Sequence, residues 1–176
     1  MRVRSVTDLQ VGDVGFSVIG GQVGALVSLG QAILTPACWF THTYIVAEKL
    51  PNAVSVVEAM PGGARRKFLY GRDRIGEGFG WARLPMSPEQ RASVTIHALE
   101  LQGVPYSFLD YLALATHGRI LRGRVTSSGH MICSQLVDQV LTRAGFEVFD
   151  DGRLSQDVTP GALFRRVGAL GEICWE

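Results

Sequence analysis

Two side chains that could together perform acyl-transfer chemistry stand far apart in this sequence. Cys133 opens a run, residues 133–137, with the pattern of the first turn of an amphipathic helix, and His42 precedes an apolar run typical of a strand. Backbone N–H groups and the positive dipole end at a helix N-terminus favour a thiolate over a thiol. A histidine held against that thiol would accept its proton and later deliver it to a leaving group. The pair therefore predicts a thiol enzyme.

Enzymes of this kind also need a group that orients the base. Glu58 is the candidate, because it lies near the end of a predicted strand, residues 53–59, which we expect to pair with the strand at residues 43–47. A carboxylate on the neighbouring strand can accept the imidazole N–H and fix its tautomer. Each residue taken alone also fits a structural role: Cys133 as a small buried hydrophobe, His42 as a hydrogen-bonded core histidine, and Glu58 as a solvated charge at a strand end.

The elements that must position these residues form an antiparallel sheet with helices packed against it, an α+β fold. We expect a short strand after a turn at Gly12-Asp13, strands at residues 43–47, 53–59 and 67–70, and turns at residues 49–52 and 61–63. Helices are predicted at residues 23–34, 88–102, 105–115 and 133–144, with a last one starting at Thr159-Pro160. Residues 71–81 and 117–129 are predicted loops.

The composition predicts one globular domain, residues 1–176, and excludes several functions. Hydrophobic residues make up 47% of the chain and the formal net charge is +1, which argues against nucleic-acid binding. Three cysteines without a C-x-x-C pair indicate neither a disulfide framework nor a zinc ribbon. His130 stands three residues before Cys133, but no third and fourth ligand follows at useful spacing. We therefore expect no metal and no cofactor.

A long uncharged segment raises the question of a membrane. Residues 14–47 contain no Asp, Glu, Lys or Arg, and residues 14–34 could span a bilayer by length. Five glycines and two glutamines interrupt that part, so a buried strand, turn and short helix is the better interpretation. Asp8 and Asp13 precede any apolar run, which is unlike a secretory signal, and a cytoplasmic location is expected.

The order of the short motifs resembles a known family. A histidine strand, a glutamate strand and a late helix-borne cysteine are similar to the circularly permuted branch of the NlpC/P60 papain-like superfamily, the YiiX-like amidase group. The motifs that carry the resemblance spread over residues 11–167: Gly12-Asp13-Val14, Thr41-His42-Thr43, Val57-Glu58-Ala59, Gly103-Val104-Pro105-Tyr106, Cys133-Ser134-Gln135-Leu136-Val137 and Thr159-Pro160. The resemblance implies a papain-like fold in which Tyr106 lies beside the nucleophile.

The function implied by this resemblance is a thiol hydrolase that cleaves an amide or ester through an acyl-enzyme. Cys133 would be the nucleophile, His42 the base and Glu58 its orienter, and the Cys133 N–H would hold the oxyanion together with Tyr106. Tyr106 equally fits a core aromatic with a satisfied hydroxyl. A peptide, such as a peptidoglycan peptide, or another small acyl compound is the expected substrate.

Two alternatives stay open at this point. A lipid-acting acyltransferase or esterase fits the apolar segment before His42. A catalytically inactive domain of the same fold would instead dock a partner or membrane through residues 14–34 and two basic clusters, Arg65-Arg66-Lys67 and Arg119, Arg122 and Arg124. A solvated face is the ordinary explanation of both clusters.

Overall fold

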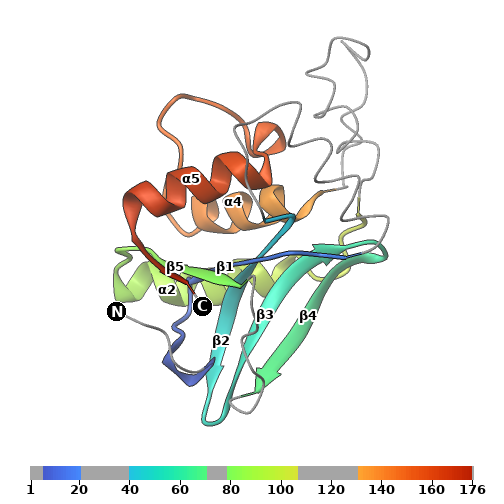
Figure 1. The fold of residues 1–176 in the computed structure, drawn as a ribbon, viewed down its shortest axis with the longest axis vertical. Helices are drawn as coiled ribbons and strands as arrows, with labels where there is room; N and C mark the ends of the chain where they lie inside the picture. Colours follow the sequence, from blue (N-terminus) through green and yellow to red (C-terminus); the bar gives the residue numbers. More distant parts are fainter. Residues whose placement is uncertain (1–5, 21–39, 71–78, 107–130, 176) are drawn as a thin grey trace.

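The protein has an α+β fold built on a six-stranded antiparallel sheet. The computed structural model describes residues 6–20, 40–70, 79–106 and 131–175 (Figure 1). The described elements are η1 (Val6–Asp8), β1 (Val14–Ser17), β2 (His42–Leu50), β3 (Ala53–Met60), β4 (Gly63–Tyr70), β5 (Gly80–Arg83), α2 (Pro88–Glu100), α4 (Cys133–Arg143), η2 (Ser155–Asp157), α5 (Pro160–Leu170) and β6 (Glu172–Trp175).

The strand order β4-β3-β2-β1-β5-β6 places β2, which begins with His42, inside the sheet. On one side β2 pairs with β1, with Ser17 opposite His42, and on the other side with β3. The predicted antiparallel pairing of the histidine and glutamate strands is therefore confirmed. The turn between them is shorter than predicted, because Leu50 already pairs with Ala53 and only two residues connect the strands.

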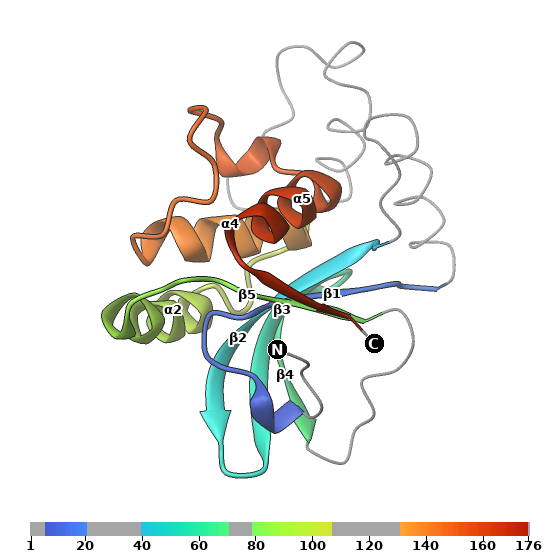
Figure 2. The same ribbon diagram turned by 60° about the vertical axis from the view of Figure 1, so that its left-hand side comes forward.

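Apolar residues cover both faces of the sheet. The larger cluster joins alternate residues of the strands, among them Ile45 and Val57, to buried residues of α2, α4 and α5. The smaller cluster packs Tyr44, Val46 and Trp81 against Val6 and Leu9, at and just after η1. Figure 2 shows the three helices and η1 on opposite sides of the strands. Because successive strand residues point to opposite faces, β2 contributes to both clusters.

The helices begin where the sequence predicts them to begin. Ser87 caps α2 by accepting a hydrogen bond from the Gln90 N–H, and Thr159 caps α5 through the Ala162 N–H. Helix α4 starts at Cys133 and ends before Gly145, whose φ of 75° is a conformation that glycine adopts without strain. The starts of α2, α4 and α5 are thus confirmed.

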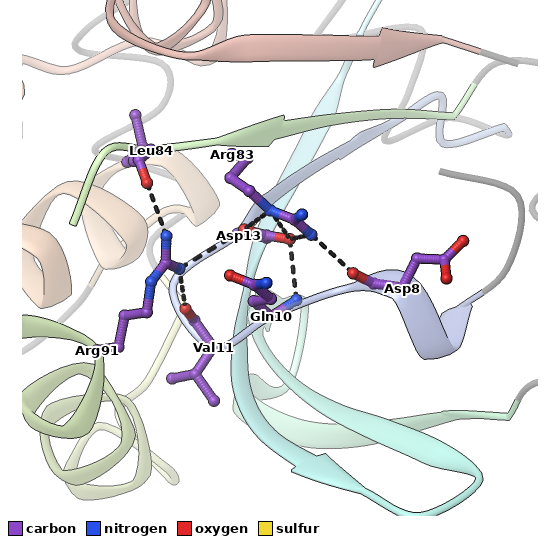
Figure 3. A network of polar contacts seen from close by, with 7 residues as sticks. All are labelled: Asp8, Gln10, Val11, Asp13, Arg83, Leu84 and Arg91. Carbon is purple, nitrogen blue, oxygen red and sulfur yellow. Dashed lines mark hydrogen bonds and ion pairs between the residues drawn. The ribbon is translucent and has the colours of Figure 1, made fainter. Parts of the chain in front are cut away.

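A buried carboxylate fixes the entry into β1. Asp13 is 1% exposed and accepts hydrogen bonds from the Arg83 guanidinium of β5 and from the Gln10 N–H (Figure 3). Arg83 also donates to the Asp8 carbonyl at 2.7 Å, and Arg91 of α2 lies 3.7 Å from the carboxylate. Asp13 and Arg83 together therefore tie the start of β1 to β5, α2 and η1.

Some predicted boundaries were wrong. The predicted loop at residues 71–81 ends too late, because Gly80 and Trp81 belong to β5, and β4 begins at Gly63 rather than Lys67. Strand β6 was not predicted; it forms by pairing with β5, where Gly80 lies opposite Trp175. Strands β5 and β6 form by pairing with distant strands, which local sequence patterns do not record, whereas β4 begins early because Gly63 pairs with Met60 across the turn.

Several predictions fall outside the described residues. The helix predicted at residues 23–34, the loop predicted at residues 117–129 and most of the helix predicted at residues 105–115 lie there; Pro105 and Tyr106, which are described, are not helical. Within the described ranges, no helix is long and apolar enough to cross a membrane.

Candidate active site

The sheet brings His42 and Glu58 into direct contact. The His42 Nε2 lies 2.9 Å from the Glu58 Oε2 and donates a hydrogen bond to it. Both side chains are buried, at 4% and 5% exposure, in neighbouring strands. A carboxylate that accepts from one ring nitrogen fixes the ring's orientation and tautomer. The other ring nitrogen, Nδ1, is left for another partner.

The thiol of Cys133 lies close to His42. The Cys133 side chain raises the pKa of the His42 imidazole through hydrogen bonding and charge, and Cys133 is the first residue of α4 and is 6% exposed. Residues that the sequence separates widely, one at the start of β2 and one at the start of α4, therefore meet. Among the cysteines with described side chains, Cys133 is the free one.

The electrostatics favour a charged imidazole. Burial lowers the pKa of His42, but its hydrogen bonds with Cys133 and Glu58 and the charges of both groups outweigh burial and raise that pKa from 6.5 to about 9. The raised pKa favours the protonated imidazolium, which lies against the Glu58 carboxylate. A protonated imidazole in this position can donate its proton to the leaving group during an acyl transfer.

Arg65 is the site residue that sequence reasoning missed. Its Nε lies 2.9 Å and its Nη2 2.8 Å from the Glu58 Oε1, so Oε1 and Oε2 serve different partners. Burial raises the pKa of Glu58, but the bonds from His42 and Arg65 lower it from 4.5 to about 2. A signal was available: the two-residue turn after Met60 sets the register that places Arg65 opposite Glu58.

The start of α4 is fixed by a side chain within its own first turn. The Gln135 Oε1 accepts the Ile132 N–H at 3.0 Å, and its Nε2 donates to the Gln156 carbonyl at 2.8 Å. The Ser134 hydroxyl donates to the Val158 carbonyl at 2.6 Å. Ile132 provides no side-chain cap, unlike the residues that cap α2 and α5. The first N–H groups of α4, which have no helical acceptor, thus also lack a capping oxygen from Ile132.

The structure places Tyr106 beside the start of α4. Tyr106 forms an isolated parallel bridge with Met131, and the Met131 N–H donates to the Pro105 carbonyl at 3.1 Å. Burial raises the pKa of Tyr106, and the charge of Cys133 raises it further. The Tyr106 side chain is half-buried.

The Tyr44 ring packs against the His42 ring. The two ring centroids are 5.9 Å apart, and the Tyr44 ring also meets Trp81 edge to face at 5.1 Å. Burial and the charge of Glu58 raise the pKa of Tyr44. Gly15 permits this packing, because a Cβ there would lie 2.6 Å from Tyr44 Cζ and 2.8 Å from Trp81 Cζ3.

The remaining candidates lie elsewhere. His97 of α2 contacts Glu100 at 3.1 Å near the protein surface. Cys38, His117 and His130 lie outside the described residues, as does the second basic cluster. In the described ranges no group of three or more His, Cys, Asp or Glu side chains could hold a metal ion.

Comparison with known proteins gives a likeness of fold. No protein-family model matches the chain, and no curated protein matches it. One solved structure with a similar fold is that of the metalloprotein YiiX from Escherichia coli O157:H7, described as DUF1105, with a TM-score of 0.55 and 20% identity. The match covers 95% of this chain and 88% of YiiX.

YiiX is described as a metalloprotein, but the His42–Glu58 pair of this protein does not fit a metal ion. The His42 Nε2 and the Glu58 Oε2 are hydrogen-bonded to each other, and the Glu58 Oε1 accepts from a guanidinium. A metal needs such donor atoms directed at one common point. Here they are directed at partners within the protein.

Proposed function

We propose that this protein is a cysteine hydrolase of the permuted papain-like type, which cleaves an amide or ester through a covalent acyl-enzyme. The observation that supports the proposal is the buried His42–Glu58 contact of 2.9 Å, beside the start of α4, where Cys133 is near enough to raise the pKa of His42. Nucleophile, base and orienting group in hydrogen-bond contact are the signature of activated thiols. The fold shared with YiiX agrees with the family that the sequence motifs resemble.

The reaction divides into two acyl transfers. The Cys133 sulfur, its proton held by His42, attacks the substrate carbonyl carbon and forms a C–S bond while the carbonyl oxygen becomes an oxyanion. His42 gives the proton to the leaving amine or alcohol as the C–N or C–O bond breaks. A water molecule then loses a proton to His42 and attacks the thioester. Collapse releases the carboxylic acid and returns the sulfur and His42 to their starting state.

The oxyanion has donors near the sulfur. The Cys133 N–H is the first of α4 and has no acceptor within the helix, and the helix dipole there favours negative charge. Tyr106, close enough for its pKa to respond to the Cys133 charge, is our candidate for a second donor. A peptide amide, as in peptidoglycan peptides, is the substrate class that the family resemblance favours.

The structure makes the inactive docking domain a weaker alternative. Val14–Ser17, the first part of the uncharged segment, is a fully buried strand and offers no docking surface. In the first basic cluster, Arg65 pairs with Glu58 and Arg66 with Glu48, so two of its three charges have acidic partners.

The test is the pH dependence of Cys133 alkylation by iodoacetamide, resolved by mass spectrometry. We expect rapid modification of Cys133 below neutral pH and loss of this reactivity in His42→Ala. His97→Ala is the matched control, because His97 also contacts a carboxylate but lies in α2 near the surface. Equal reactivity in the wild type and His42→Ala would overturn the proposal.

A second measurement distinguishes a hydrolase from a protein whose Cys133 thiol is reactive but not catalytic. Incubation with peptide amides and with aryl and acyl esters should give a product and an acyl adduct on Cys133 visible by mass spectrometry. Cys133→Ala should abolish both. A reactive thiol that never forms an acyl adduct across these substrates would contradict the hydrolase assignment.

A further inference from the structure

We propose that Arg65 is a positioning residue of the site: its guanidinium holds the Glu58 carboxylate so that one oxygen always faces His42. This inference rests on the function proposed above. It adds a fourth side chain to the chain of contacts from Cys133 through His42 to Glu58.

The division of the two carboxylate oxygens carries the argument. Two Arg65 nitrogens, Nε and Nη2, both contact the Glu58 Oε1, at 2.9 Å and 2.8 Å. The Oε2 is left to His42 at 2.9 Å. Because Arg65 holds Oε1, rotation of the carboxylate would break a charge-assisted hydrogen bond from Nε and the ion pair with Nη2. The orientation of His42 is thereby tied to β4.

Arg65 also has an electrostatic role during the reaction. Glu58 is buried, and burial alone raises its pKa, so the carboxylate needs cations to stay ionised. His42 is one such cation, but it becomes neutral each time it gives its proton to the leaving group. Arg65 keeps its charge throughout. It therefore keeps Glu58 an acceptor in the step in which His42 is neutral and prevents Glu58 from taking the proton itself.

The neighbouring arginine provides the matched control. Arg65 extends from solvent onto a buried partner: its side chain is 57% exposed and that of Glu58 is 6%. Arg66 instead pairs with Glu48, with side chains 31% and 27% exposed, and its guanidinium lies 4.6 Å from the Phe68 ring centroid. The two arginines are adjacent on β4, so replacing either removes one positive charge from the same strand.

The experiment compares Arg65→Ala, Arg65→Lys and Arg66→Ala with the wild type by two readouts. The first is the pH profile of Cys133 alkylation. In Arg65→Ala we expect the acid side of the profile to move up by at least about one pH unit, which is about a tenfold slower rate at a fixed acidic pH. Arg65→Lys should restore part of the rate, because it returns the charge but not the two-nitrogen contact. Arg66→Ala should match the wild type.

The second readout is the NMR titration of the His42 ring, which does not require thiol reactivity. As Glu58 protonates at low pH, the His42 signals should shift, and this shift should occur at higher pH in Arg65→Ala than in Arg66→Ala. Identical profiles and titrations for the two alanine variants would overturn the role of Arg65. A wild-type thiol that does not depend on His42 would overturn the proposed function instead, and the titration would still test Arg65.

Discussion

Replacing Glu58 with Gln removes a buried negative charge that His42 and Arg65 share, and we expect a loss of stability that depends on pH. The pKa of Glu58 is lowered from 4.5 to about 2 in the folded protein. Each pKa unit corresponds to about 1.4 kcal/mol, so the lowering is linked to about 3 kcal/mol of unfolding free energy. This is an upper limit, because the Arg65 side chain is 57% exposed and solvent weakens its share.

The sign of the pH dependence follows from the direction of the shift. A lowered carboxyl pKa stabilises the folded state fully above pH 4.5, and the effect is lost as the pH falls through about 2. The raised pKa of His42 acts in the opposite direction. It stabilises the folded state fully below pH 6.5, and this stabilisation is lost as the pH rises through about 9. The two shifts describe one pairing and are not added. Its full contribution is present near pH 6.

The assay is urea unfolding of the wild type and Glu58→Gln at pH 6 and pH 3. We expect a difference of about 3 kcal/mol at pH 6 that shrinks to about 1 kcal/mol at pH 3. Glu48→Gln is the control, because its ion pair with Arg66 is partly exposed and such pairs contribute less than about 1 kcal/mol. A Glu58→Gln difference equal at both pH values, or no larger than that of Glu48→Gln, would refute the reasoning.

Three further predictions concern the elements around the site. Asp13→Asn should lower the urea unfolding free energy by about 3 to 5 kcal/mol, because it leaves the Arg83 guanidinium without its buried anion; a loss below 1 kcal/mol would contradict this. Gly15→Ala should lower the thermal midpoint, with a cost of about 1 to 3 kcal/mol from overpacking against Tyr44, and should slow thiol alkylation because that ring supports His42; an unchanged midpoint and rate would contradict it. Gln135→Glu should cost about 1 to 3 kcal/mol in urea unfolding at neutral pH, because a carboxylate cannot donate to the Gln156 carbonyl; wild-type stability would show that this bond is dispensable.

The parts of the fold that could be predicted are those encoded by neighbouring residues. The cap at Ser87, the cap at Thr159 and the start of α4 follow from side chains that bond within one turn of the helix or from its apolar spacing. The pairing of β2 with β3 follows from the short turn between them. Such signals lie within a few residues of the feature that they specify.

The parts that could not be predicted depend on distant partners. Strand β6 forms because it pairs with β5, roughly ninety residues earlier. Its short sequence alone does not distinguish a strand from irregular chain. Arg65 is an intermediate case: its neighbours fit a solvated basic cluster, and only the register of the β3–β4 hairpin places it opposite the buried Glu58. For the candidate site, residue types suggested the members, and only the fold gives their contacts.

The order in which the site forms during folding follows from where its members lie in the chain. Glu58 lies sixteen positions after His42, and Arg65 lies seven positions after Glu58, within consecutive hairpins. Cys133 lies about 90 residues beyond His42, so its arrival closes a much longer loop and should come later. A nascent chain would thus form the imidazole–carboxylate–guanidinium unit before the Cys133 thiol is near it. The reactive sulfur would be activated only when folding is nearly complete, when few exposed groups remain for it to attack.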